Sequence, residues 1–287
     1  LNPNSISHYF ETTSLPLANP PVKTEIHLPK ISDRLATASQ RGGLHPVVFK
    51  PTRSLDLQAL DLRGTTTSQR RKLVTDAART VSSDNKTELT SLFNQLGIEP
   101  TELWLSGMFS AELSEAQINA LADDSRIGWL WLDDLKSQPY GKPTENPRSI
   151  EWHLNDIGAP EAWSMGFDGS GMIVGLIDSG VAYDHPDLVN HMWDGGAEFP
   201  NHGWDAVDDD DEPYDGDADS FHGTHTAGLI VGDGTGGYTT GAAPGATLMA
   251  LRAIPGTYND LIEALQFGLD NGAWIFSFSA GWPQAAN

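Results

Sequence analysis

The sequence predicts a doubly wound α/β domain with a parallel sheet, preceded by a smaller α+β domain. In the second half of the chain, near-continuous apolar runs at 172–177, 229–231, 247–251 and 274–278 alternate with helical segments. Such runs are typical of parallel strands that are buried on both faces. In the first half, strands and helices are expected to alternate, which indicates a small sandwich with one helical face.

The chain divides into an arm, two domains and a linker. Residues 1–45 contain scattered Pro, Asn and Ser with little hydrophobic periodicity, so we expect an extended arm. The small domain is expected over 46–135. Residues 136–148 lack periodicity and are expected to form a linker, after which the α/β domain covers 149–287.

The small domain opens with a strand and a long helix. An apolar strand is expected at 47–49. Residues 89–96 then carry Leu and Phe at the i, i+3, i+4 and i+7 positions of a helix, and Gly97 supplies its C-terminal stop.

A strand, a helix and a strand complete this domain. The first of these strands is expected at 103–113, and Ser114 with Gln117 forms a capping box that begins the helix. The last strand is expected at 128–132. The expected order of strand, helix, strand, helix and strand indicates a small α+β sandwich.

Composition narrows the functional classes. The chain contains no cysteine, which excludes disulfides, thiolate zinc sites and cysteine nucleophiles. Its net charge is −22, and residues 149–287 hold 22 acids against one base, Arg252. Nucleic acid and anionic membranes are bound through Lys and Arg, so we expect neither as a partner. The excess carboxylate suits either solvation or cation binding.

Two motifs of the second domain carry an acid and a base. Segment 171–181 reads GMIVGLIDSGV, which places Asp178 at the carboxyl end of an apolar strand, where open α/β folds hold their sites. Segment 222–228 reads HGTHTAG and begins with His222. Serine protease chemistry needs a base for the hydroxyl proton and a buried carboxylate that orients the base. Asp178 and His222 fit these roles.

Two other interpretations of these residues stay open. Asp178 could cap a turn at Ser179, as strand-terminal Asp residues often do. His222 and His225 could bind zinc as an i, i+3 pair together with a nearby carboxylate, although no glutamate of that helix could serve as a hydrolytic base.

Both motifs resemble those of the subtilisin-like serine proteases, and residues 152–163 (WHLNDIGAPEAW) resemble the opening of the family's catalytic domain. The resemblance implies a secreted endopeptidase that acts on polypeptide substrates, with Asp178 and His222 as triad members and no organic cofactor. The family's Gly-Thr-Ser-x-x-x-Pro motif does not occur up to Asn287. We therefore expect an incomplete subtilisin-like sheet that is inactive alone, with the nucleophilic Ser and the oxyanion Asn supplied by a downstream remainder of the catalytic domain.

The small domain resembles the propeptide of the same family, in its run 109–133 and in its position before the Asp178 motif. The resemblance implies a ferredoxin-like α+β fold for this domain. It also implies a zymogen in which the domain assists folding and acts as an intramolecular inhibitor. Its C-terminal tail, some part of 133–147, would lie across the active cleft, and the processing site would fall within 133–148. An unrelated α+β accessory domain is the alternative.

Calcium is the cation that the sequence favours. The run 205–219 contains nine acids and no base, and a hard cation with six to eight oxygen ligands relieves such repulsion. By resemblance to a calcium loop of the family, Asp205 and Asp210 are the expected side-chain ligands, and a solvated loop is the alternative. Asp187 with loop 233–239 is a second expected position.

Residues 277–281 resemble the strand and turn that pair with substrate in the family. The resemblance implies that Ser279, Ala280 and Gly281 bind substrate by strand addition, and that Tyr258 borders a more distant subsite. An ordinary sheet-end turn is the alternative. For the whole chain, the alternative to a peptidase is a noncatalytic calcium-binding or interaction protein that retains a degenerate protease half.

Overall fold

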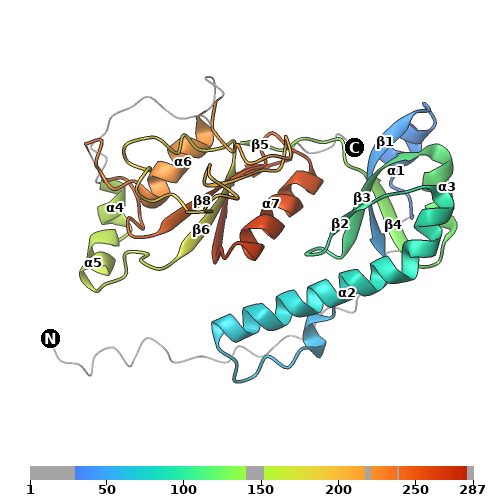
Figure 1. The fold of residues 1–287 in the computed structure, drawn as a ribbon, viewed down its shortest axis with the longest axis horizontal. Coiled ribbons are helices and arrows are strands. Elements are labelled where there is room, and N and C mark those ends of the chain that lie inside the picture. Colours follow the sequence, from blue (N-terminus) through green and yellow to red (C-terminus); the bar gives the residue numbers. More distant parts are fainter. Residues whose placement is uncertain (1–29, 140–151, 217–220, 238, 283–287) are drawn as a thin grey trace.

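The computed structural model describes residues 30–139, 152–216, 221–237 and 239–282. Over these ranges the chain forms a small domain on a four-stranded antiparallel sheet and an α/β domain on a four-stranded parallel sheet. Figure 1 shows the two side by side, with one helix of the α/β domain facing the small domain.

The small domain has the βαββαβ order of ferredoxin-like folds, with sheet order β2-β3-β1-β4 and antiparallel neighbours throughout. Its helices and strands, with a short strand that follows the domain, are α1 (Asp33–Ser39), β1 (Leu44–Pro51), the 3-10 helix η2 (Leu57–Ala59), α2 (Thr67–Leu96), β2 (Thr101–Leu103), β3 (Met108–Ser114), α3 (Glu115–Asp123), β4 (Ile127–Leu132) and β5 (Gln138–Pro139).

Local signals set the ends of its helices. Thr66 begins α2 with a capping box, and Gly97 ends it in the left-handed conformation at φ 64°. Ser114 and Gln117 form the predicted capping box of α3. The Gly97 stop and the Ser114–Gln117 capping box are confirmed, because each depends on residues close together in the sequence, whereas the Thr66 cap was not predicted.

Two predictions for this domain are wrong. The expected strand at 103–113 is a hairpin of β2 and β3, because Gly107 at φ 67° lets the chain reverse between them. The expected arm is structured from residue 30 onward: Ser32 caps α1, and Ile31 pairs in parallel with Leu130 at the edge of β4. Residues 1–29 lie outside the described part.

The core of the small domain lies between its sheet and its helices. Phe49, Phe93 and Phe109 form a cluster of aromatic contacts, with ring centroids 5.5–6.0 Å apart. Leu89 and Ile118 bring α2 and α3 into the same core.

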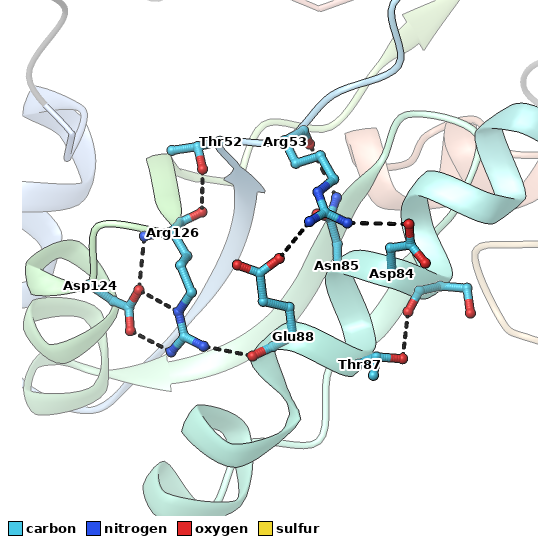
Figure 2. Close-up of polar contacts among 9 residues, drawn as sticks. Thr52, Arg53, Asp84, Asn85, Thr87, Glu88, Asp124 and Arg126 are labelled. Atoms are coloured by element: carbon cyan, nitrogen blue, oxygen red, sulfur yellow. Dashed lines mark hydrogen bonds and ion pairs between the residues drawn. The ribbon is translucent and has the colours of Figure 1, made fainter.

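Polar contacts hold α2 to the loops at one end of the sheet (Figure 2). Arg53, just after β1, pairs with Asp84 and Glu88 of α2. Arg126 forms a bidentate pair with Asp124 and donates to the Glu88 carbonyl. The pair with Arg126 lowers the pKa of Asp124 to about 2, chiefly through the side-chain hydrogen bond.

The α/β domain has four parallel strands in the order β7-β8-β6-β9. Its elements are α4 (Trp152–Asp156), α5 (Ala159–Ser164), β6 (Ile173–Asp178), β7 (Gly203–Asp205), α6 (His222–Val231), β8 (Thr247–Arg252), α7 (Tyr258–Asp270), β9 (Ile275–Phe278) and β10 (Ala280–Gly281). Helix α6 packs on one face of the sheet and α7 on the other. This is the predicted doubly wound arrangement.

The chain leaves β6 toward β7 and β8 on one side of the sheet and later adds β9 on the other side. The carboxyl end of β6 is therefore a topological switch point, where open α/β sheets form their ligand crevices. Asp178 is the last residue of β6 and lies at this point.

One strand prediction in this domain is wrong. Residues 229–231 are the last turn of α6 and not a strand, since a run of three apolar residues fits a buried helix as well as a buried strand. Strand β7 was not predicted at all. Helix α7 begins with a capping box of Thr257 and Asp260.

Candidate active site

Asp178 and His222 meet at the carboxyl end of β6. His222 Nδ1 lies 2.7 Å from Asp178 Oδ1, and the two side chains are 8% and 0% exposed. The amide of Ser179 donates a second hydrogen bond to Asp178 Oδ1, at 2.8 Å. Because a carboxylate only accepts hydrogen bonds, Nδ1 of the imidazole carries the hydrogen. The neutral imidazole then has its lone pair on Nε2, which is the tautomer that a general base requires.

A close helix–strand approach brings the histidine to the aspartate. Gly223, the second residue of α6, packs against the turn that follows β6. A Cβ added there would lie 2.0 Å from the Gly180 carbonyl oxygen and 3.1 Å from Asp178 Cβ. Only glycine allows this approach, which explains the residue after His222 in the motif.

Two residues that the sequence analysis missed hold the first turn of α6. Helix N-termini present amides without intrahelical partners. The Gly223 amide donates to Ser179 Oγ at 2.9 Å, and the Thr224 amide donates to Asp215 Oδ2 at 3.1 Å. Asp215 also accepts from the hydroxyls of Thr224 and Ser179, at 2.8 and 3.3 Å.

Asp215 is fully buried, and this burial raises its pKa although its hydrogen bonds oppose the shift. Through Ser179 and Thr224 it connects the turn after Asp178 to the helix of His222. In the sequence it is one of nine acids in a run, and no local signal distinguishes it from the others.

The predicted calcium ligands of the acidic loop have other partners. Asp205 and Asp210 are bridge partners in an antiparallel pair, so they are close together. Asp205 Oδ1 accepts from the amides of Val207 and Asp208, and its other oxygen accepts from the Arg252 guanidinium, which also pairs with Asp208. The Arg252 guanidinium therefore already neutralises charge at Asp205 and Asp208.

The structure brings part of the second predicted calcium position together. Asp187 accepts a hydrogen bond from the Gly236 amide, so it does contact loop 233–239. Asp233 pairs with His191 at 3.1 Å, and the Thr235 amide lowers the pKa of Asp233. In the described part of the chain, no three His, Asp or Glu side chains are grouped to hold a metal ion. Calcium is also bound by backbone carbonyls and water, so calcium at these two places stays a prediction.

The predicted substrate-binding residues lie on a short strand that is already paired. Ala280 and Gly281 form β10, which pairs antiparallel with β5, the segment after the small domain. Ser279 lies between β9 and β10. On its other side, this segment bonds to the loop after β8, because the Ser137 amide donates to the Gly256 carbonyl at 2.6 Å. The segment 137–139 thus contacts both β10 and the loop after β8.

Tyr258 begins α7 and lies between aromatic neighbours of both domains. Its ring centroid is 5.9 Å from that of Trp131 and 6.3 Å from that of Trp282. Burial, and to a lesser degree the charge of Asp133, raises the pKa of Tyr258.

A cavity of about 470 Å³ opens beside the turn after Asp178. Its lining combines the acidic loop, which includes Asp208 and Glu212, with Ser179, Ile254 and Arg252. Acids outnumber the single base there, so the surroundings of the Asp178–His222 pair carry negative charge.

Comparison with known proteins agrees with this geometry. The model of the subtilase family matches residues 169–287. Residues 169–287 belong to the subtilase family. Bacillopeptidase F of Bacillus subtilis (strain 168) is 37% identical over 154 residues, which cover 50% of this chain and 10% of that protein. Thermitase of Thermoactinomyces vulgaris is 34% identical over 140 residues, which cover 46% of this chain and 45% of thermitase. The chain thus spans less than half the length of these subtilases.

A solved structure extends the likeness in fold to most of the chain. Fervidolysin from Fervidobacterium pennivorans, a keratinolytic enzyme related to subtilisin, superposes with a TM-score of 0.53 at 18% identity. The match covers 84% of this chain and 36% of fervidolysin. At this identity it supports the subtilisin-like fold alone. No helix in the described ranges is long and apolar enough to cross a membrane.

Proposed function

We propose that the chain is the N-terminal part of a secreted subtilisin-like serine endopeptidase precursor, in which Asp178 and His222 are the acid and base of the catalytic triad. The observation that carries this proposal is the buried 2.7 Å contact between Asp178 Oδ1 and His222 Nδ1 at the switch point of the sheet.

In the proposed reaction, Nε2 of His222 takes the hydroxyl proton of a serine as that oxygen attacks the peptide carbonyl, and then returns the proton to the leaving amine. Asp178 stabilises the imidazolium through Nδ1. The serine and the oxyanion Asn are proposed to lie on a segment outside this sequence. Polypeptides are the proposed substrates.

We also propose that the small domain is the propeptide and inhibits the site with its own chain. The pairing of β5 with Ala280 and Gly281, together with the Ser137–Gly256 hydrogen bond, supports this role. A segment that pairs with β10 and also bonds to the loop after β8 is held as a substrate would be in strand addition. The proposed processing site then falls within 133–148, of which residues 140–148 lie outside the described part.

The proposal of secretion is supported by a relative. The minor extracellular protease Vpr of Bacillus subtilis (strain 168) is 36% identical over 136 residues, which cover 44% of this chain and 16% of Vpr.

The experiment is labelling with a serine-directed phosphonate of the complete polypeptide that contains this sequence. We expect one labelled serine, and a labelling rate that falls about ten-thousandfold in Asp178→Asn, because the imidazole loses its orienting partner. Asp156→Asn, which removes an exposed carboxylate charge, is the matched control. Labelling that is equal in all three proteins, or absent from the wild type, would favour the noncatalytic alternative.

A further inference from the structure

Helix α2 is longer than the core of the small domain requires. Its 30 residues begin at Thr67, but its buried side chains begin only at Ala78. Figure 1 shows the N-terminal half of α2 extending beyond the antiparallel sheet and running alongside the α/β domain. Two arginines of this half make contacts outside the small domain.

Arg71 binds the C-terminal end of α7. Its Nη2 donates to the Leu269 carbonyl oxygen at 2.9 Å, and its guanidinium lies 4.9 Å from the ring centroid of Trp274. The last carbonyls of a helix lack intrahelical partners and carry partial negative charge, so a cation is stabilising there.

Arg79 binds the same end of α7 two turns further along. It pairs with Asp270, the last residue of α7, while its guanidinium stacks 3.8 Å above the ring of Trp104. Arg71 and Arg79 lie about 12 Å apart on one face of α2, from the 1.5 Å rise per residue. In the β2–β3 turn, the Leu105 amide adds a hydrogen bond to Gln266 Oε1 of α7, at 3.1 Å.

The small domain also binds the opposite end of α7. The two carboxylate oxygens of Asp133 accept from the amides of Tyr258 and Asn259, each at 3.1 Å. The helix thus meets an anion at its positive end and cations at its negative end. Between the two ends lies an apolar contact that includes Val48, Leu103 and Ile262.

The charge distribution makes the arginines the cations available for this contact. Residues 149–287 contain one basic residue, Arg252, which is paired with Asp205 and Asp208. The negative end of α7 is therefore neutralised from the small domain.

We propose that Arg71 and Arg79 form a latch that holds the small domain on the α/β domain after the chain between them is cut. The latch is separate from the β5–β10 pairing. Segment β5 follows Asp133, which binds the N-terminal end of α7, whereas the two arginines bind its C-terminal end. It does not depend on peptidase activity, and its test needs no catalysis.

The test cuts the full chain at a site-specific protease sequence placed within 140–151. One cysteine is introduced into each fragment to attach a donor and an acceptor fluorophore. Because the chain has no cysteine of its own, no other thiol is labelled. Energy transfer on dilution then gives the dissociation constant of the two fragments. Circular dichroism of each uncut variant confirms that it folds.

We expect the wild-type fragments to stay associated at low salt. Arg71→Ala should raise the dissociation constant about tenfold, as for a half-buried hydrogen bond from a charged group. Arg79→Ala should raise it about threefold, because its ion pair is more exposed. Lys72→Ala is the matched control, since Lys72 pairs only with Asp76 of its own helix among the described residues.

A charge exchange separates the pair from general destabilisation. Arg79→Asp should weaken association further than Arg79→Ala, and adding Asp270→Arg should restore most of the loss. The latch is overturned if the wild-type fragments separate on cutting, if Lys72→Ala matches Arg71→Ala, or if the charge exchange restores nothing.

Discussion

The approach of α6 to the turn after β6 gives the sharpest test of how the Asp178–His222 pair is built. In Gly223→Ala the new Cβ would lie 2.0 Å from the Gly180 carbonyl oxygen, whereas ordinary contact begins at 3.4 Å. Helix α6 must therefore move by about 1.4 Å, the difference between these distances. Added to the 2.7 Å between Nδ1 and Oδ1, this shift takes the contact beyond hydrogen-bond range.

We expect Gly223→Ala to lower the free energy of unfolding by about 3 kcal/mol. Overpacking contributes about 1–3 kcal/mol, and the loss of a hydrogen bond to a buried carboxylate contributes about 1.5–3 kcal/mol. Urea denaturation measures the total. Proton NMR measures the bond itself, because a hydrogen held between imidazole and carboxylate resonates at low field, and this signal should vanish in the variant.

Gly228→Ala is the control in the same helix. Its Cβ would meet only Thr240 Oγ1, at an ordinary 3.7 Å, so we expect stability to rise by about 0.5–1 kcal/mol through the helix propensity of alanine. The low-field signal should remain. A Gly223→Ala protein that is as stable as wild type and keeps that signal would falsify the steric account of the site.

Two further predictions concern buried carboxylates. Asp215→Ala should lower the free energy of unfolding by about 2–4 kcal/mol, because it removes the partner of the Thr224 amide and of two hydroxyls. It should also broaden the low-field signal of His222. Asp211→Ala is the control, and equal effects of the two variants would contradict the positioning role of Asp215. Burial raises the pKa of Asp133 above its usual value of 3.8, so the folded state binds the proton more tightly than the unfolded state. The resulting stability is complete below about pH 4 and is lost as pH rises through the folded pKa. The stability difference between wild type and Asp133→Asn, measured by urea denaturation from pH 4 to 7, should therefore fall with pH, and a flat difference would refute the assignment.

The sequence by itself determined the elements that depend on neighbouring residues. The Ser114–Gln117 capping box and the Gly97 stop are local signals, and each forms as predicted. The apolar run before Asp178 predicts a buried parallel strand, because one segment carries both the hydrophobicity and the length. Resemblance between the motifs and those of known proteases then paired Asp178 with His222.

The tertiary structure decided those contacts between distant residues for which the sequence carries no motif. The identity of Asp215 as the partner of Ser179 and Thr224 follows from burial, which a run of nine acids does not reveal. Arg252 neutralises Asp205 across 47 positions. The contacts of Arg71 and Arg79 with the end of α7 join residues almost 200 positions apart. Periodicity and caps act over a few residues, whereas these contacts exist only after the two sheets and α7 have packed.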